Sequence, residues 1–167
     1  MKKATAAAQR SEPDPPPADR GKMKRSRNRQ VAALPFRING SRPEVMLITS
    51  RETGRGIIPK GWPQKGRSPH VVAMREAYEE AGLKGRIRKR PVGTFRYQKR
   101  LAGEQGMICR VTVFLLEVKR QLEDWPEKGS RKRCWLAPDE AADRVEEEEL
   151  CALLSGLTDR LGGLREG

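Results

Sequence analysis

Three glutamates that lie close together give this sequence its clearest chemical signal. Glu79 and Glu80 follow Glu76 by three and four residues, so on an α-helix all three side chains project from roughly one face. Like charges at this spacing repel and weaken an isolated helix. A hard divalent cation would offset the repulsion, because Mg²⁺ binds carboxylate oxygens together with water and substrate phosphates. The trio therefore predicts a metal site on a helix.

The flanking residues predict where that helix begins and ends. Ser68 can cap the N-terminus, Pro69 suits the first helical position, and Gly82 suits the left-handed residue after the last turn. Arg75 stands four residues before Glu79 and next to Glu76, so it can orient a carboxylate. The residues that offer an apolar side for burial are Val72, Ala73, Ala77 and Ala81.

A longer pattern encloses the helix. Gly61 is followed after five residues by Arg67 and, after seven more, by the run REAYEEAGL at 75–83. This arrangement resembles the signature of the Nudix hydrolases at every fixed position except one, where Arg67 replaces the first glutamate. The alternative is a solvated acidic helix face, but a match of this length is far more specific than a short glycine motif. The resemblance implies an α/β fold, a Nudix-like α/β/α sandwich with a mixed β-sheet.

The same resemblance implies roles for the residues of the signature. Glu76 and Glu80 would coordinate Mg²⁺ or Mn²⁺ together with the main-chain carbonyl of Lys60, and Glu79 would accept a proton from the attacking water. Arg67 could contact substrate phosphate, pair with Glu80 or be a plain surface charge. Its presence leaves the number of bound metal ions open.

Segments outside the signature resemble one branch of the family, the diphosphoinositol polyphosphate phosphohydrolases. These segments are Ser50-Arg51 with Arg55 and Pro59, and 122–125 with 131–133 and Trp135. Carried over by position, the residues expected to bind substrate phosphates are Ser50, Arg51, Arg100 and Arg131, with Lys60 near the cleaved group and Arg29 and Lys99 as neighbouring candidates. Each could instead be a solvated surface group. The loop departs from the branch at Gly56 and at 60–63, so substrate identity does not carry over.

Length, charge and composition limit the class of protein to which this chain can belong. A length of 167 residues suits one domain, and a net charge of +13 predicts an anionic partner, such as a phosphorylated small molecule, nucleic acid or an acidic membrane surface. Three widely spaced cysteines, Cys109, Cys134 and Cys151, favour reduced buried thiols over a disulfide or zinc site. No apolar run approaches the ~20 residues that span a bilayer. No secretory signal is apparent, so we expect a cytoplasmic protein.

The order of the expected elements predicts how the site is held. Residues 1–28 are expected to form a disordered basic arm, 29–162 the Nudix hydrolase domain and 163–167 a tail. Strands are expected at 31–36, 45–48, 87–97 and 107–118, with Pro35 marking an edge strand or a bulge and with the strand at 87–97 interrupted at Pro91 and Gly93. Beyond the helix at 69–81, a short helix is expected from Pro138, and a single amphipathic helix over 146–161.

Three functions are compatible with these residues. The first is a metal-dependent pyrophosphohydrolase that cleaves phosphoanhydride bonds in a diphosphoinositol polyphosphate or a dinucleoside polyphosphate. The second, hydrolysis at the 5′ end of RNA, is disfavoured because aromatic residues make up only 5% of the chain, whereas single-strand binders rely on base stacking. The third is a catalytically silent module that binds polyanions, which would gain nothing from clustered carboxylates.

Overall fold

The computed structural model describes residues 28–99 and 106–165. Nearly all of the expected arm at 1–28 and the last two residues of the expected tail lie outside the described residues. Arg100, one of the expected phosphate ligands, lies outside them as well. In the described part, no helix is long and apolar enough to cross a membrane.

A mixed sheet runs through the molecule, and its main path has the strand order β3-β2-β1-β7-β5. Strand β4 pairs with β1, β6 with β7, and β8 with β2. The central pair, β1 and β7, is parallel, whereas the other pairings are antiparallel. The strands are β1 (Arg29–Asn39), β2 (Arg42–Thr49), β3 (Gly56–Ile57), β4 (Lys60–Gly61), β5 (Leu83–Ile87), β6 (Gly93–Lys99), β7 (Met107–Gln121) and β8 (Arg133–Leu136).

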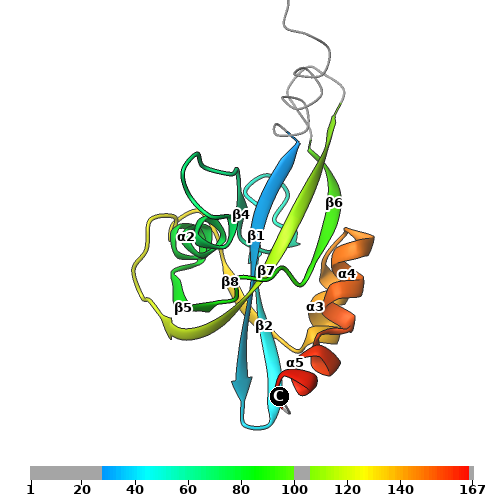
Figure 1. Ribbon diagram of the computed structural model, residues 1–167. Coiled ribbons are helices and arrows are strands. Elements are labelled where there is room, and N and C mark those ends of the chain that lie inside the picture. Colours follow the sequence, from blue (N-terminus) through cyan, green and yellow to red (C-terminus); the bar gives the residue numbers. More distant parts are fainter. Residues whose placement is uncertain (1–27, 100–105, 166–167) are drawn as a thin grey trace, which may run out of the picture.

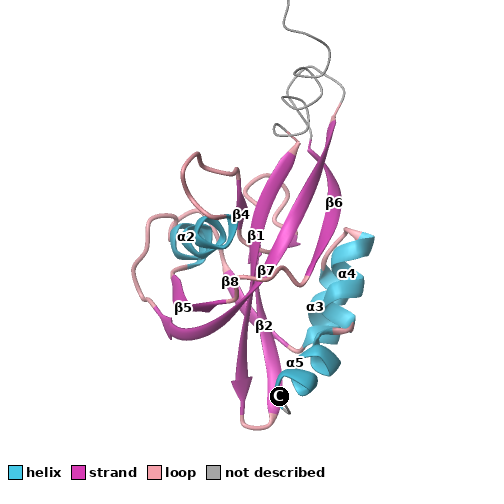
Figure 2. Cartoon of the chain, viewed as in Figure 1, coloured by secondary structure: helices cyan, strands magenta, loops and turns pink. Residues whose placement is uncertain are grey.

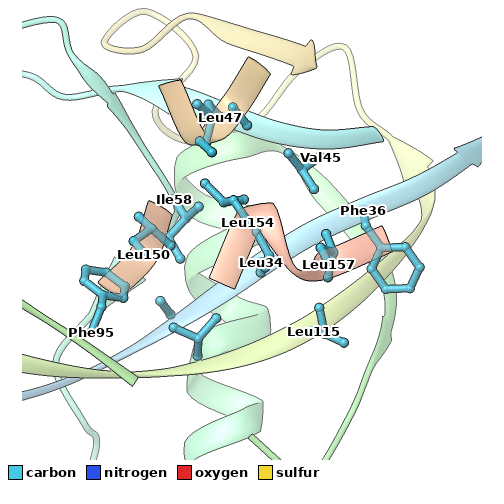
Figure 3. Packing of buried hydrophobic residues seen from close by; sticks show 14 of the residues in the cluster. Leu34, Phe36, Val45, Leu47, Ile58, Phe95, Leu115, Leu150, Leu154 and Leu157 are labelled. Carbon is cyan, nitrogen blue, oxygen red and sulfur yellow. The ribbon is translucent and has the colours of Figure 1, made fainter. Parts of the chain in front are cut away.

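Helices cover both faces of this sheet, which confirms the expected α/β/α sandwich (Figures 1 and 2). Helix α2 (Pro69–Ala81) lies on one face, and α3 (Pro138–Arg144), α4 (Glu148–Ser155) and α5 (Leu157–Arg165) lie on the other. Successive side chains of a strand point to opposite faces. Val31 and Ala33 therefore pack toward α2, while Leu34 and Phe36 pack among the leucines of α4 and α5 (Figure 3).

The edge position predicted from Pro35 is wrong, because β1 lies between β2 and β7. On one side, β1 pairs with β4 only at Val31 and Ala32, and with β2 only from Phe36 onward. Pro35 falls between these two ladders. A proline, which has no N–H to donate, is tolerated there in the interior of the sheet.

Two expected elements are divided in the structure. The strand expected at 87–97, with interruptions at Pro91 and Gly93, is two strands, β5 and β6, separated by the segment 88–92, so the break at Pro91 is confirmed; Gly93 itself begins β6. The helix expected at 146–161 is two helices, because α4 ends at Ser155 before Gly156 and α5 continues to Arg165. Of the three thiols expected to be buried, Cys109 is buried, Cys151 is half-buried and Cys134 is exposed.

Candidate active site

Helix α2 begins and ends where the sequence predicts. Gly82 ends it with φ 65°, although the Ser68 side chain makes no capping hydrogen bond. Two side chains from beyond β7 fasten its C-terminal end: Trp125 Nε1 donates to the carbonyl of Glu80 at 3.2 Å and Arg133 Nη1 donates to that of Ala81 at 3.1 Å. Carbonyls that the last helical turn cannot pair are thereby satisfied, and the helix is held in one orientation.

A cavity of about 630 Å³ lies beside α2, between the loop 50–55, β4 and β6. It brings together most of the predicted site residues, which come from five separate parts of the chain. Those that line it are Ser50, Arg51, Lys60, Glu76, Glu80, Lys99 and Arg131. Glu79, Arg75 and Arg29 do not line it.

Glu76 and Glu80 are two carboxylates that are costly to ionise where they lie. The pKa of each is raised to about 7, chiefly by burial; Glu79 and Glu127 also contribute to the rise at Glu76, whereas Arg131 opposes the rise at Glu80. Glu80 is 6% exposed and accepts a hydrogen bond from the Lys60 main-chain N–H at 3.3 Å, and its other oxygen lies 3.6 Å from Arg131 Nη2. Positive charge placed between these two side chains would favour their ionised forms.

The donor set fits a Mg²⁺-like cation that is completed by substrate and water. Within residues 28–99 and 106–165, no three Asp, Glu, His or Cys side chains form a closed cation cage. Mg²⁺ is commonly held by only one or two carboxylates plus waters and phosphate oxygens, and Glu76 and Glu80 supply that number. The cation beside Glu80 is Arg131, and Arg67 is exposed, so the expected alternative of an Arg67–Glu80 pair is wrong.

Glu79 and Arg75 form an ion pair outside the lining of the cavity, with Arg75 Nε 3.0 Å from Glu79 Oε1. Both side chains are partly exposed, and the pair realises the orienting contact expected from their spacing. The Glu79 carbonyl also accepts the main-chain N–H of Glu127 at 3.0 Å, which joins the helix to the loop at 122–132. The proton-accepting role of Glu79 stays a prediction.

The side chains of the expected phosphate ligands differ in how strongly other groups of the protein already engage them. Arg131 is held internally, donating to Glu127 Oε1 at 3.1 Å and to the carbonyl of Thr49 at 3.1 Å. Arg51 also contacts Glu127, yet its side chain is 56% exposed. Ser50 Oγ lies 2.7 Å from Thr53 Oγ1. Arg51 is therefore available to a ligand, whereas Arg131 mainly organises carboxylates.

Two lysines lie against aromatic rings of the cavity. Lys60 Nζ is 4.9 Å from the centre of the Tyr97 ring, and Lys99 Nζ is 4.7 Å from that of Trp62. Burial lowers the pKa of Lys60, against the opposing effects of Glu80 and Glu147. The neighbouring carboxylates favour the charged form of Lys60, at a place where phosphate could enter.

Sequence reasoning missed several residues of the site. The sequence predicts only a polar loop around Glu127, and no local pattern links this residue to α2. The sequence predicts Tyr97 only as a strand residue. In the structure its hydroxyl donates to Gln30 Oε1 at 2.5 Å. Trp62 lines the cavity with 38% of its surface exposed, and its place directly after Gly61 is the one signal that could have indicated it.

Gly61 must lack a side chain for Glu76 to keep its place. A Cβ on Gly61 would meet the Glu76 carboxylate more closely than real Cβ atoms approach other atoms. We expect Gly61→Ala to displace that carboxylate and to weaken Mg²⁺ binding by about ten- to a hundredfold, the range seen when partners that orient a metal ligand are removed. Titration calorimetry measures this. Gly129→Ala is the matched control, since its Cβ meets nothing within 4 Å; equal affinity in both variants would contradict the prediction.

The raised pKa values predict how stability depends on pH. Glu76 and Glu80 bind protons more tightly in the folded chain than in the unfolded chain, where they titrate near 4.5. Between about pH 4.5 and 7 the folded state therefore holds more protons, and the stability of the metal-free protein falls as pH rises. Urea unfolding at pH 5 and pH 8 tests this. The double variant Glu76→Gln/Glu80→Gln is expected to flatten the slope, whereas Glu52→Gln/Glu148→Gln, at two exposed glutamates, is expected to keep it.

Comparison with known protein sequences places these residues in a known family. The model of the NUDIX domain matches residues 27–153. The chain is 34% identical over 103 residues to "Nudix hydrolase 12, mitochondrial" of Arabidopsis thaliana, covering 60% of this chain and 51% of that protein. It is 35% identical over 115 residues to diphosphoinositol polyphosphate phosphohydrolase 3-alpha of Mus musculus, covering 68% and 66%. The chain thus spans about half the length of the plant relative.

Solved structures with the same fold are similar to this chain. The C. elegans Ap4A hydrolase binary complex gives a TM-score of 0.63 at 19% identity, covering 81% of this chain and 98% of that one. The NUDIX domain of Shewanella oneidensis NrtR with ADP ribose gives 0.59 at 15% identity, covering 80% and 87%. At these identities the likeness concerns the fold alone. Because the domain model matches well over half of the sequence, including α2 and its carboxylates, this chain belongs to the Nudix family.

Proposed function

We propose that this protein is a metal-dependent pyrophosphohydrolase that cleaves a phosphoanhydride bond in a polyphosphorylated small molecule. The observation that carries the proposal is the pairing of Glu76 and Glu80 in a cavity that Arg51, Lys60 and Lys99 also line. Two carboxylates attract a divalent cation, and the cationic side chains attract the phosphates that such a cation bridges. A binder of anions alone has no use for the carboxylates.

The chain's own residues have distinct tasks in this proposal. Bound between Glu76 and Glu80, Mg²⁺ or Mn²⁺ would neutralise phosphate charge and activate a water. Arg131 holds Glu80 in place through its 3.6 Å contact. Glu79, oriented by Arg75 at 3.0 Å, accepts a proton. Arg51 and Lys99 hold the phosphates farther from the cleaved bond.

Two substrate classes follow, diphosphoinositol polyphosphates and dinucleoside polyphosphates. The mouse relative is named for the first, and the C. elegans structure is that of an Ap4A hydrolase. Trp62, at the mouth of the cavity, favours the second class, because an exposed indole can stack on a nucleobase and has no equivalent partner on a phosphorylated inositol.

A panel of substrates tests the proposal. Purified protein is incubated with Mg²⁺ or Mn²⁺ and a diphosphoinositol polyphosphate, a dinucleoside polyphosphate, a nucleotide sugar or triphosphorylated RNA, and the products are separated by chromatography. Metal-dependent cleavage of either of the first two supports it. Cleavage confined to RNA, or none at all with metal bound, overturns it.

Trp62 separates the two substrate classes. We expect Trp62→Ala to raise KM for the dinucleoside polyphosphate by about tenfold, since stacking on one base is worth about 1–3 kcal/mol. KM for the diphosphoinositol substrate is expected to change little. Tyr78→Ala is the matched control: Tyr78 is 37% exposed, close to the 38% of Trp62, but lies outside the cavity. Equal changes for both substrates would contradict a stacking role.

The basic arm at 1–28, the tail and a cytoplasmic location stay predictions of the same proposal. Fractionation of cells that express the tagged protein tests the location. The full chain compared with a chain that starts at residue 29 tests whether the arm contributes to substrate affinity.

A further inference from the structure

A second cavity, of about 600 Å³, lies where the segment between β5 and β6 meets β7 and α5. It shares no lining residue with the candidate active site. Its charged lining consists entirely of cations, which are Arg86, Arg88, Lys89, Arg90 and Arg160. Nothing in the proposed reaction uses this cavity.

The wall of this cavity is fastened at both ends. The Arg88 N–H donates to the carbonyl of Leu115 at 2.9 Å, and the Val92 N–H donates to that of Val113 at 2.8 Å. From α5, Arg160 Nη1 donates to the carbonyl of Val92 at 2.5 Å. The main chain of segment 88–92 is thus tied to β7 and to α5, so the exposed side chains of Arg88, Lys89 and Arg90 extend from a fixed backbone beside the cavity.

The positive charge here is only partly offset by its described neighbours, among which Glu117 lies opposite Arg86 in the β5–β7 ladder. In the described ranges, Arg86, Arg88, Lys89 and Arg90 make no ion pair. The nearby carboxylate of Glu117 is engaged at 2.6 Å by Lys119, whose hydrogen bond, with help from Arg88 and Arg86, holds the pKa of Glu117 below its usual value.

Edge protection does not account for this arrangement. Charged residues along an edge strand such as β5 discourage pairing with another chain. Protection of the β5 edge does not require Arg160. This residue lies far away in the sequence, on α5, and lines the same cavity. Convergent cations around a cavity are the expected surroundings of a bound polyanion.

The lining also limits the kind of anion. Its apolar members are Ile87, Pro91, Val92 and Leu115. Among residues 28–99 and 106–165, no aromatic side chain lines the cavity, whereas single-stranded nucleic acids are usually held by stacking. The volume falls within the range of small-molecule sites, about 300–1,000 Å³. We propose that this cavity is a second binding site, separate from the active site, for a small organic molecule that carries several phosphates.

Binding measured without divalent metal tests this proposal independently of catalysis. ATP is titrated into the full chain in EDTA by calorimetry, and amide shifts are followed by NMR. We expect shifts at 86–92 and at Leu115, and affinity for ATP above that for inorganic tripolyphosphate, because the apolar lining contacts the organic part. Arg88→Ala/Arg90→Ala is expected to weaken ATP binding about tenfold.

Two controls assign the binding to this cavity. Arg42→Ala/Lys128→Ala removes the same charge from exposed positions elsewhere and is expected to leave affinity within about twofold. Arg51→Ala/Lys99→Ala removes cations from the active-site cavity and is expected to leave the shifts at 86–92 intact. Equal weakening by all three pairs overturns the proposal, as does tighter binding of an oligouridylate than of ATP. Circular dichroism verifies that each variant is folded.

Discussion

Glu80→Gln is expected to lower turnover on the cleaved substrate by at least about a hundredfold. Glu80 is one of two carboxylates in the cavity, and glutamine keeps its shape while removing the charge that would hold the cation. Loss of a residue that merely orients a metal ligand already costs about ten- to a hundredfold, so loss of the ligand charge itself is expected to exceed this range. Rates at saturating Mg²⁺, with calorimetric titration of the metal, measure the effect.

The fold is expected to survive this substitution. Burial raises the pKa of Glu80 to about 7, so a neutral side chain at this position is less costly than a charged one in the metal-free protein. Thermal unfolding of Glu80→Gln without metal is therefore expected at or above the wild-type temperature. Glu148→Gln, on the exposed face of α4, serves as the control for activity. Near-normal turnover of Glu80→Gln at saturating metal would remove Glu80 from the reaction.

The second large effect is expected at Arg131, whose side chain is only 10% exposed. Arg131→Ala leaves Glu80 and Glu127 without their shared cation. Removal of one partner of a buried ion pair costs about 3–5 kcal/mol, because the remaining charge is uncompensated. We expect a loss of about 3 kcal/mol in the free energy of unfolding at pH 8, measured by urea unfolding of the metal-free protein.

The loss at Arg131 is expected to depend on pH. Below its raised pKa of about 7, Glu80 can protonate and no longer needs a cation. The loss at pH 6 should therefore be smaller than at pH 8, and it should also shrink when Arg131→Ala is made in the Glu80→Gln background. Lys132→Ala, at the exposed neighbouring position, is the control. A loss that is equal at both pH values and in both backgrounds would mean that Arg131 acts only through packing.

Helix α2 shows which structural features can be predicted from neighbouring residues alone. Pro69 and Gly82 bound α2 as predicted, because first-turn proline and left-handed glycine depend on backbone conformation alone. The apolar side of Ala77 and Ala81 is buried as predicted from helical spacing. The break within 87–97 was likewise predicted from Pro91, because a proline cannot donate to a ladder. The helix expected over 146–161 was placed less well, since it is broken at Gly156.

The candidate active site shows which contacts cannot be predicted from neighbouring residues. Glu76, Glu79 and Glu80 were expected on one face, yet only Glu76 and Glu80 line the cavity, while Glu79 pairs with Arg75. The partner of Glu80 is Arg131, which lies beyond three intervening strands and a loop and was predicted only as a phosphate ligand. Contacts of this kind depend on how β8 is placed beside β2, and sequence spacing does not contain that information.

The amino-acid sequence by itself determined the family, the limits of the acidic helix and the positions of the two carboxylates proposed to hold a metal ion. These features depend on the spacing of neighbouring residues, which the chain carries before it folds. Only the tertiary structure decided which cations meet those carboxylates, that Trp62 and Glu127 stand beside them, and that the cations of 86–90 converge with Arg160 around a second cavity. The physical reason is that burial and long-range contacts, which set pKa values and cavity shape, arise only when distant segments pack together.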